Sequence, residues 1–203
     1  MAWAINILKQ HGLKKTEARI TALEHLKSKN SAVSHNDLEQ AMGDGTDRVT
    51  LYRILKTFEE KGIIANFVQD NQSLSQKGVV RGLHFQAPPF AQGKLVRVIQ
   101  GSVLDVVVDI RKNSATYGQH FCLELNEQNK TMLWIPEGFA HGFSTLEDNT
   151  IFSYKCTNYY NKASEGCVLW NDEDLQIDWK VEHPLLSDKD KLGVTLRDFS
   201  SPF

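Results

Sequence analysis

Hydrophobic positions follow two different periods along this chain of 203 residues. In residues 1–62 they recur at the short steps of a helix, as Leu23 and Leu26 do, and no proline stands before Pro88. A period near 3.6 residues is typical of amphipathic helices. The pattern therefore predicts three helices in residues 1–62.

Residues typical of helix ends support the prediction of separate helices in residues 1–62. Ser34 stands three residues before Asp37, which is the spacing of a capping box ahead of an apolar stripe. Further along, Thr46 or Asp47 is positioned to cap the last helix, and Gly62 is positioned to stop it.

After residue 62 the pattern changes to short β-branched and aromatic runs, often alternating, between Gly, Asn, Asp or Pro turns. The runs cover residues 66–73, 79–86, 94–111, 119–125, 131–146, 150–160 and 165–171. They predict a β-sandwich or barrel. Within 94–111 a Gln-Gly-Ser turn separates two apolar runs, which predicts a hairpin of a double-stranded jelly roll. The fold class expected is mainly β, with an α-helical N-terminal part.

Charge narrows the choice of partners. The net charge is −2 and the pI about 6.4, so the whole chain lacks the basic excess typical of nucleic-acid binding. Residues 1–64 carry a balance of +2 and residues 65–203 one of −4. This asymmetry only permits a basic face on the helical part.

The three cysteines are Cys122, Cys156 and Cys167, and none belongs to a CxxC pair. An odd number without such spacing argues against a disulfide framework and against a Cys-rich zinc site. The N-terminal apolar run is too short for a signal peptide, and no later run approaches the length of a membrane span. We expect a cytoplasmic protein that makes no contact with a membrane.

The last helix expected before Gly62 presents Arg48, Thr50, Tyr52 and Arg53, which are able to reach phosphates or base edges. The stretches "ILKQHGLKKTEARITALEHL" and "TLYRILKTFEEKGII" resemble the DNA-binding domain of the ferric uptake regulator family, over residues 1–63. That resemblance implies a winged-helix-like module, with Tyr52 and Arg53 as the foremost DNA contacts. The clustered metal ligands of such regulators do not follow, so the sequence argues against a nucleic-acid partner.

Candidates for proton chemistry gather in the strand-rich part. They are His84, Lys94, His141, Tyr154, Tyr159 and Asp190. On successive strands of a jelly roll, whose side chains alternate, they could line one cavity. A metal-binding cupin would need an H-x-H pair, but Gln86 stands where the second His would be, so no metal is expected. Taken singly, His141 and Tyr159 could equally be core residues, and Asp190 a solvated carboxylate.

Several blocks in this part resemble the dTDP-4-dehydrorhamnose 3,5-epimerase family, over residues 64–203. They include "FVQDNQSLSQKGVVRGLHFQ", "AQGKLVRVIQGSVLDVVVDIRKNSATYGQ", "LWIPEGFAHGF", "YKCTNYYN" and "LWNDEDLQIDW". The resemblance implies a metal-independent, cupin-type homodimer without cofactor. Such an enzyme inverts C3 and C5 of a dTDP-linked 4-keto-6-deoxyhexose through an enolate.

The same resemblance assigns roles. It implies His84 paired with Asp190 as the base, Lys94 near the enolate oxygen and Tyr154 as the reprotonating acid. Residues similar to substrate-binding positions of the family are Gln69, Asn71, Arg81, His141 and Tyr159. An arginine such as Arg81 suits a diphosphate.

The family normally begins with about fifty residues that include strands, a D-x-R-G segment and an aromatic stretch, part of which grips substrate in the partner subunit. Here the helical part stands in that place. We therefore expect a fusion, with a helical module at 1–62 and an epimerase domain at 63–203. Ile63 and Ile64 are expected to be buried against the barrel or a partner subunit. The alternatives to an epimerase, active or impaired by the missing arm, are a DNA-binding regulator and a catalytically silent binder of nucleotide sugars.

Overall fold

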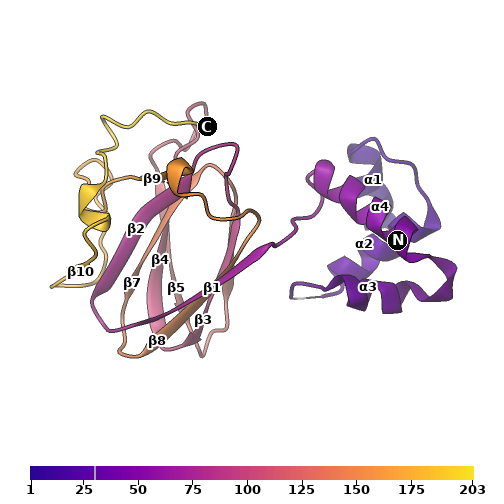
Figure 1. Cartoon of the computed structure of the whole chain (residues 1–203), viewed down its shortest axis with the longest axis horizontal. Helices are drawn as coiled ribbons and strands as arrows, with labels where there is room; N and C mark the ends of the chain where they lie inside the picture. The colour runs from indigo at the N-terminus through magenta and orange to yellow at the C-terminus, as the bar shows by residue number, and fades with distance from the viewer. Residues whose placement is uncertain (30) are drawn as a thin grey trace. The chain divides into compact units, whose positions relative to one another are not determined.

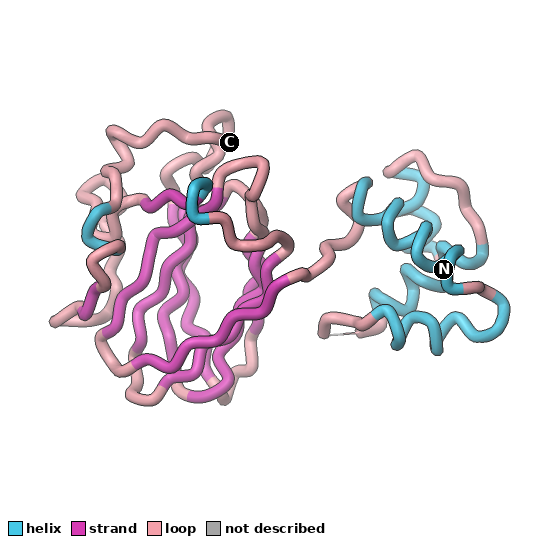
Figure 2. The backbone as a smooth tube through the Cα atoms, viewed as in Figure 1, coloured by secondary structure: helices cyan, strands magenta, loops and turns pink. Residues whose placement is uncertain are grey.

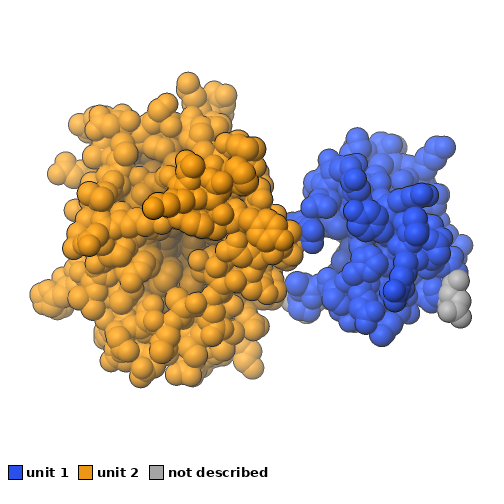
Figure 3. Space-filling model, in the orientation of Figure 1, with its two compact units in different colours: residues 1–66 blue, residues 67–203 orange. Residues whose placement is uncertain are grey.

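The computed structural model describes residues 1–29 and 31–203, and it divides into two compact units. Residues 1–66 form the helical unit and residues 67–203 form the jelly-roll unit (Figure 3).

The described part of the helical unit contains four α-helices: α1 (Ala2–Gln10), α2 (Glu17–Lys27), α3 (His35–Met42) and α4 (Arg48–Glu60), with a 3-10 turn η1 (Gly43–Gly45) before α4. The expectation of three helices is therefore wrong. The first segment breaks at Gly12, whose φ of +67° is easy only for glycine. The chain starts again at Thr16, which accepts a hydrogen bond from the amide of Arg19 and caps α2.

The other boundary signals are confirmed. Ser34 and Asp37 form the capping box of α3, each side chain bonding the other residue's amide. Asp47, not Thr46, caps α4 by accepting from the amide of Thr50 at 2.9 Å. Gly62, with a φ of +65°, follows the end of α4.

The described residues of the helical unit contain no strand, so a winged-helix module is not confirmed. Ile63 and Ile64, which were expected against the barrel or a partner subunit, pack against the core of the helical unit, beside Phe58. The chain turns back at Gly62, where the amide of Ile63 donates to the carbonyl of Phe58 at 2.8 Å.

The jelly-roll unit is built from ten strands in two sheets (Figures 1 and 2). A four-stranded sheet has the order β1 (Gln69–Ser75), β8 (Thr150–Cys156), β3 (Lys94–Gln100), β6 (Met132–Ile135). A six-stranded sheet has the order β10 (Leu185–Leu186), β2 (Val79–Gln86), β7 (Phe139–Thr145), β4 (Ser102–Asp109), β5 (His120–Asn126), with β9 (Glu165–Cys167) also pairing with β2. Two 3-10 turns, η2 (Lys162–Ser164) and η3 (Asp190–Leu192), lie in the connections.

The predicted hairpin in residues 94–111 is wrong, although both strands are present. β3 pairs with β6 and β8, whereas β4 pairs with β5 and β7, so the turn carries the chain from one sheet to the other. Gly101 makes this possible: its φ is +78°, and an added Cβ would lie 2.4 Å from the Thr150 hydroxyl.

Two apolar layers hold the unit together. The layer between the sheets includes Val96, Val107 and Phe152. A second layer covers the other face of the six-stranded sheet, where the C-terminal part of the chain packs Trp179 and Phe203 against it. The six-stranded sheet is therefore buried on both faces, and the mainly β jelly-roll expectation is confirmed.

Candidate active site

A cavity of about 560 Å³ lies within the jelly-roll unit and takes side chains from both sheets. The four-stranded sheet contributes Gln69 and Asn71 of β1, Lys94 of β3, and Tyr154 and Cys156 of β8. The six-stranded sheet contributes Arg81 and His84 of β2, His141 of β7 and Glu165 of β9. The cavity thus brings together most of the residues that the sequence singled out.

An irregularity in β2 places the central histidine. The pairing of β2 with β7 shifts register between Arg81 and His84, so Gly82 leaves the ladder there. A Cβ on Gly82 would lie 2.5 Å from the Cα of Gly142, so only glycine allows the two strands to approach so closely. The amide of Gly82 is thereby free to donate to Asp190 Oδ1 at 3.0 Å.

His84 and Asp190, 106 residues apart in sequence, form a close pair: Nε2 of the ring lies 2.7 Å from Oδ1 of the carboxylate. The side chain of Asp190 is fully buried, which excludes the interpretation of a solvated surface carboxylate. Burial by itself raises the pKa of Asp190, but hydrogen bonds from His84 and two further donors outweigh it and hold this pKa well below its usual value. Asp190 is therefore an ionised acceptor, and Nε2 of His84 carries the hydrogen.

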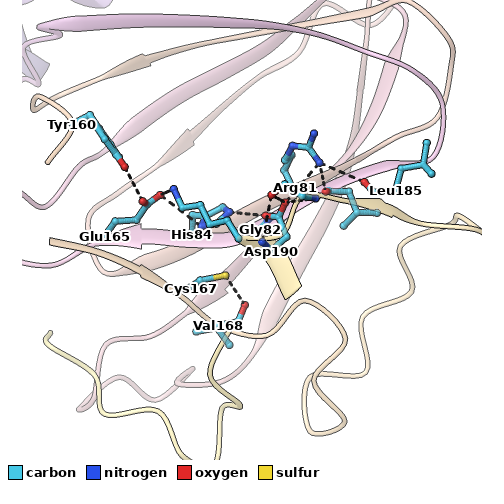
Figure 4. A network of polar contacts seen from close by, with 12 residues as sticks. Arg81, Gly82, His84, Tyr160, Glu165, Cys167, Val168, Leu185 and Asp190 are labelled. Carbon is cyan, nitrogen blue, oxygen red and sulfur yellow. Dashed lines mark hydrogen bonds and ion pairs between the residues drawn. The ribbon is translucent and has the colours of Figure 1, made fainter. Parts of the chain in front are cut away.

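The opposite ring nitrogen of His84, Nδ1, faces the carboxylate of Glu165. Nδ1 is buried and has no hydrogen-bond partner among the described residues, and Oε1 of Glu165 lies 3.8 Å from it. Glu165 accepts from the Tyr160 hydroxyl at 2.9 Å (Figure 4). It also accepts from the ammonium of Lys189. Hydrogen bonds therefore connect Tyr160 to Glu165 and His84 to Asp190, and 3.8 Å separates Glu165 from Nδ1 of His84 between these two pairs.

Lys94 and Tyr154 lie together on the four-stranded sheet, with the ammonium 5.9 Å from the centre of the phenol ring. Burial lowers the pKa of Lys94 and raises the pKa of Tyr154, because each charged form loses water. The phenol therefore stays protonated at neutral pH, as a proton donor requires.

His141 belongs to a second histidine–carboxylate pair. Its Nε2 lies 2.9 Å from Oδ2 of Asp105, and its Cα is the partner of the Cα of His84 across β2 and β7. The ring also stacks on Phe152 at 6.2 Å. His141 is a nearly buried residue with one edge on the cavity, so the core and cavity interpretations both hold for it.

The predicted substrate residues on β1 form a bonded row. Gln69 donates to Asn71 at 3.1 Å, and Asn71 donates to the sulfur of Cys156 at 3.6 Å. Arg81 reaches the cavity with a partly exposed side chain, 3.6 Å from Oδ2 of Asp190.

Tyr159, unlike the other predicted substrate-binding residues, is not among the residues that line the cavity. Its side chain is 63% exposed, whereas the next residue, Tyr160, is a lining residue. Both follow the end of β8, where strand alternation no longer fixes which side chain turns inward. Glu165 and Lys189 were also missed. Lys189 could have been found, since it directly precedes Asp190.

A family model for dTDP-4-dehydrorhamnose 3,5-epimerase matches residues 49–198. This chain belongs to that family. An epimerase of this name from Shigella flexneri is 56% identical over 144 residues, 70% of this chain and 80% of that protein. The chain is an enzyme of the dTDP-4-dehydrorhamnose 3,5-epimerase type.

Solved structures of the epimerase family superpose on the chain. The crystal structure of dTDP-4-dehydrorhamnose 3,5-epimerase from Elizabethkingia anophelis has a TM-score of 0.66 at 50% identity, covering 70% of this chain and 80% of that one. The Legionella pneumophila dTDP-6-deoxy-D-glucose-3,5-epimerase in complex with dTDP-4-keto-L-rhamnose has a TM-score of 0.66 at 49% identity, covering 71% and 78%.

The candidate DNA contacts of this epimerase-family chain lie on α4. Arg48 is paired with Glu39 at 2.5 Å, and the Thr50 hydroxyl donates to Asp47 at 2.8 Å, so both are engaged within the helical unit. Tyr52 and Arg53 are exposed. The resemblance of residues 1–63 to ferric uptake regulators stays a prediction.

Within residues 1–29 and 31–203 of this epimerase-family chain, no group of three or more His, Cys, Asp or Glu side chains is placed to hold a metal ion. Over the same residues, no helix has the length and apolar character needed to cross a bilayer.

Proposed function

We propose that this chain inverts C3 and C5 of a dTDP-linked 4-keto-6-deoxyhexose, using His84 as base and Tyr154 as acid. The observation that carries the proposal is the His84–Asp190 pair at 2.7 Å, on the same cavity as Lys94 and Tyr154. These are the groups that deprotonation beside a ketone requires: a base, a partner for the oxyanion and an acid.

The base acts through Nδ1 of His84. The ionised carboxylate of Asp190 accepts a hydrogen bond from Nε2–H, so the neutral ring presents its lone pair at Nδ1, and the carboxylate stabilises the imidazolium that forms. Because Nδ1 is covered and Glu165 stands 3.8 Å from it, substrate must displace this carboxylate to bring a C–H bond to the ring. The contacts of Glu165 to Tyr160 and Lys189 are exposed enough to be exchanged for contacts to substrate.

Lys94 and Tyr154 complete the reaction from the opposite sheet. Removal of a proton from C3 or C5 puts negative charge on the oxygen at C4, which a buried ammonium stabilises. Lys94 supplies that ammonium, and the protonated Tyr154 returns a proton to the face opposite His84. The two residues come from β3 and β8, whereas the base comes from β2 of the other sheet, as inversion requires.

The nucleotide part of the substrate is anionic, and two cationic side chains besides Lys94 border the cavity. Arg81 and Lys189 suit a diphosphate, Arg81 through a bidentate guanidinium. Gln69, Asn71 and His141 supply polar contacts, and Tyr160 replaces Tyr159 in the proposed set.

The enzyme works without metal or cofactor, since proton transfer at carbons beside a ketone needs only ionisable side chains. We further propose a cytoplasmic homodimer. Exposed apolar side chains on the four-stranded sheet, Leu74, Ile99 and Trp134, support a partner subunit on its outer face.

The test is incubation of the full chain with a dTDP-4-keto-6-deoxy sugar in D₂O, followed by NMR of the sugar protons. Deuterium at both C3 and C5 supports the proposal. Binding of dTDP without any exchange would favour the catalytically silent binder, and exchange at a single carbon would contradict double inversion. An activity far below that of the family's relatives would fit the expected impairment by a missing N-terminal arm.

The DNA-binding alternative has its own measurement. Two of its four candidate contacts are engaged within the helical unit, and the charge balance of +2 over residues 1–64 attracts few phosphates. A gel shift on random DNA is therefore expected to show weak binding or none. Submicromolar, sequence-selective binding at physiological salt would support the alternative of a DNA-binding regulator.

A further inference from the structure

The carboxylate of Asp190 is held at both of its oxygens. Oδ1 accepts hydrogen bonds from Nε2 of His84 and from the amide of Gly82. Oδ2 accepts hydrogen bonds from the hydroxyl of Ser187 at 2.5 Å and from the amide of Ser187 at 3.2 Å. The proposed proton transfers assign no role to Ser187.

The second histidine–carboxylate pair lacks this support. Asp105 bonds His141 through Oδ2, but its buried Oδ1 has no hydrogen-bond partner among the described residues. Both carboxylates are fully buried, and both bond a histidine on the cavity. Asp190 therefore has donors that Asp105 lacks: the Gly82 amide on Oδ1, and on Oδ2 the two hydrogen bonds from Ser187, with Arg81 3.6 Å away. Of these, only the two from Ser187 are hydrogen bonds to the second oxygen.

Donors on the second oxygen fix the rotation of a carboxylate. A carboxylate that is bound at one oxygen can turn about its Cβ–Cγ bond, whereas one bound at both is confined to a single plane. The plane of Asp190 decides where Nε2 of His84 points, and hence where the lone pair of Nδ1 points. A base is effective only within a narrow range of distance and angle to the C–H bond.

We propose that Ser187 is a positioning residue of the epimerase, whose hydroxyl locks the Asp190 carboxylate and so aligns His84 for proton abstraction. This inference rests on the proposed function, because it assigns His84 as the base. Ser187 acts through Asp190 and does not touch the reacting atoms.

The chain contains a matched control for this arrangement. Thr195 and Asp198 repeat the same local bonds: the Thr195 hydroxyl donates to Asp198 Oδ2 at 2.7 Å, and the amide of Asp198 donates back to that hydroxyl at 3.3 Å. The amide-to-carbonyl bond is 3.1 Å in both motifs. The Thr195 motif is exposed and bonds no histidine, so Thr195→Ala removes the local bond alone.

The experiment compares Ser187→Ala, Ser187→Thr and Thr195→Ala in the full chain. Ser187→Ala is expected to lower kcat about 10-fold with KM unchanged, the loss expected for a hydrogen bond to a charged group. Ser187→Thr restores most of kcat because the hydroxyl is kept. Thr195→Ala leaves both constants at the wild-type values. A wild-type kcat in Ser187→Ala, or an equal loss in Thr195→Ala, would overturn the proposal.

Imidazole NMR supplies a readout that a merely structural role would not move. The Nε2–H proton of His84, held by Asp190, gives a downfield signal that His84→Ala removes and so assigns. Ser187→Ala is expected to broaden or shift this signal, while the corresponding signal of His141 stays as an internal reference. An unchanged His84 signal in Ser187→Ala contradicts alignment by Ser187.

Two further controls keep the outcome decisive. If Ser187→Ala does not fold, Ser187→Cys replaces the hydroxyl by a weak donor of similar size, and a wild-type kcat in that variant would overturn the proposal. Loss of deuterium exchange in His84→Ala together with full activity in Ser187→Ala would contradict the role of Ser187 but not the role of His84. Full exchange in His84→Ala would contradict the role of His84 as base, whatever the result for Ser187.

Discussion

The helical unit and the jelly-roll unit use their carboxylates in different ways. In the helical unit Asp37 bonds Ser34 and Asp47 bonds Thr50, each three residues away and exposed. In the jelly-roll unit Asp190 and Asp105 are buried and bond histidines 106 and 36 residues away. Short-range pairs shape local backbone, whereas buried long-range pairs need the whole fold and orient a side chain in a cavity.

The same sequence spacing serves both purposes. Ser34 and Asp37 cap a helix at the surface, while Ser187 and Asp190, equally spaced, hold a carboxylate beneath the cavity. Burial makes the difference, because a polar contact away from water is more directional and its loss more costly. The comparison predicts that changes at buried pairs alter catalysis and that changes at exposed pairs do not.

The largest effect is expected from Asp190→Ala. Without its acceptor His84 loses its fixed tautomer and orientation, and kcat should fall by ~10³-fold. Asp37→Ala is the control from the helical unit and should leave kcat unchanged. Circular dichroism establishes that both variants fold; a folded Asp190→Ala enzyme with wild-type kcat would break the comparison.

Phe58→Ala is expected to lower stability without changing catalysis. Phe58 is fully buried in the core of the helical unit, so its truncation should lower the free energy of unfolding of that unit by about 3–5 kcal/mol. Every residue of the proposed site lies in residues 67–203, so kcat should not change. Thermal unfolding followed by circular dichroism at 222 nm, together with epimerase assays, tests both expectations. A parallel loss of activity would mean that the site depends on the helices.

Tyr154→Phe removes the proposed proton donor and keeps the ring. We expect kcat to fall by about 10²-fold, with little change in KM for the nucleotide sugar. Tyr52→Phe, on the exposed face of α4, is its counterpart and should have no effect on epimerisation. Steady-state kinetics of the two variants tests this; equal behaviour would remove Tyr154 from the mechanism.

The smallest effect concerns alkaline pH. Burial lowers the pKa of Lys94 and raises that of Tyr154, so as pH rises Lys94 loses its charge before the phenol ionises. Activity should therefore decline at a lower pH than an ordinary lysine would set. In Lys94→Arg the guanidinium stays charged, and the decline should move to higher pH. Normalised profiles of kcat against pH measure this, and an identical decline in Lys94→Arg would assign it to another group.

Much of the fold could be predicted because local signals carry it. The strand β2 and the cap of α3 follow from alternation and from the Ser34–Asp37 spacing. The turn at Gly101 was correctly placed but wrongly read as a hairpin, since a local turn does not reveal which sheet the next strand joins. The sequence likewise did not reveal that Ile63 and Ile64 pack on the core of the helical unit, because apolar character predicts burial but not the surface that buries a residue.

The site shows the same limit. The pairing of His84 with Asp190 came from family resemblance, because no spacing in the sequence connects residues 106 apart. Ser187 was readable in principle, since it precedes Asp190 by the spacing noted at Ser34. Its meaning needed the burial of Asp190, which only the folded chain provides.

The central claim is that the buried His84–Asp190 pair abstracts the substrate proton, and deuterium incorporation by His84→Ala tests it most directly. In D₂O the variant should bind dTDP like the wild type yet incorporate deuterium at C3 and C5 at least ~10²-fold more slowly. Incorporation at the wild-type rate in a folded His84→Ala variant would contradict the account.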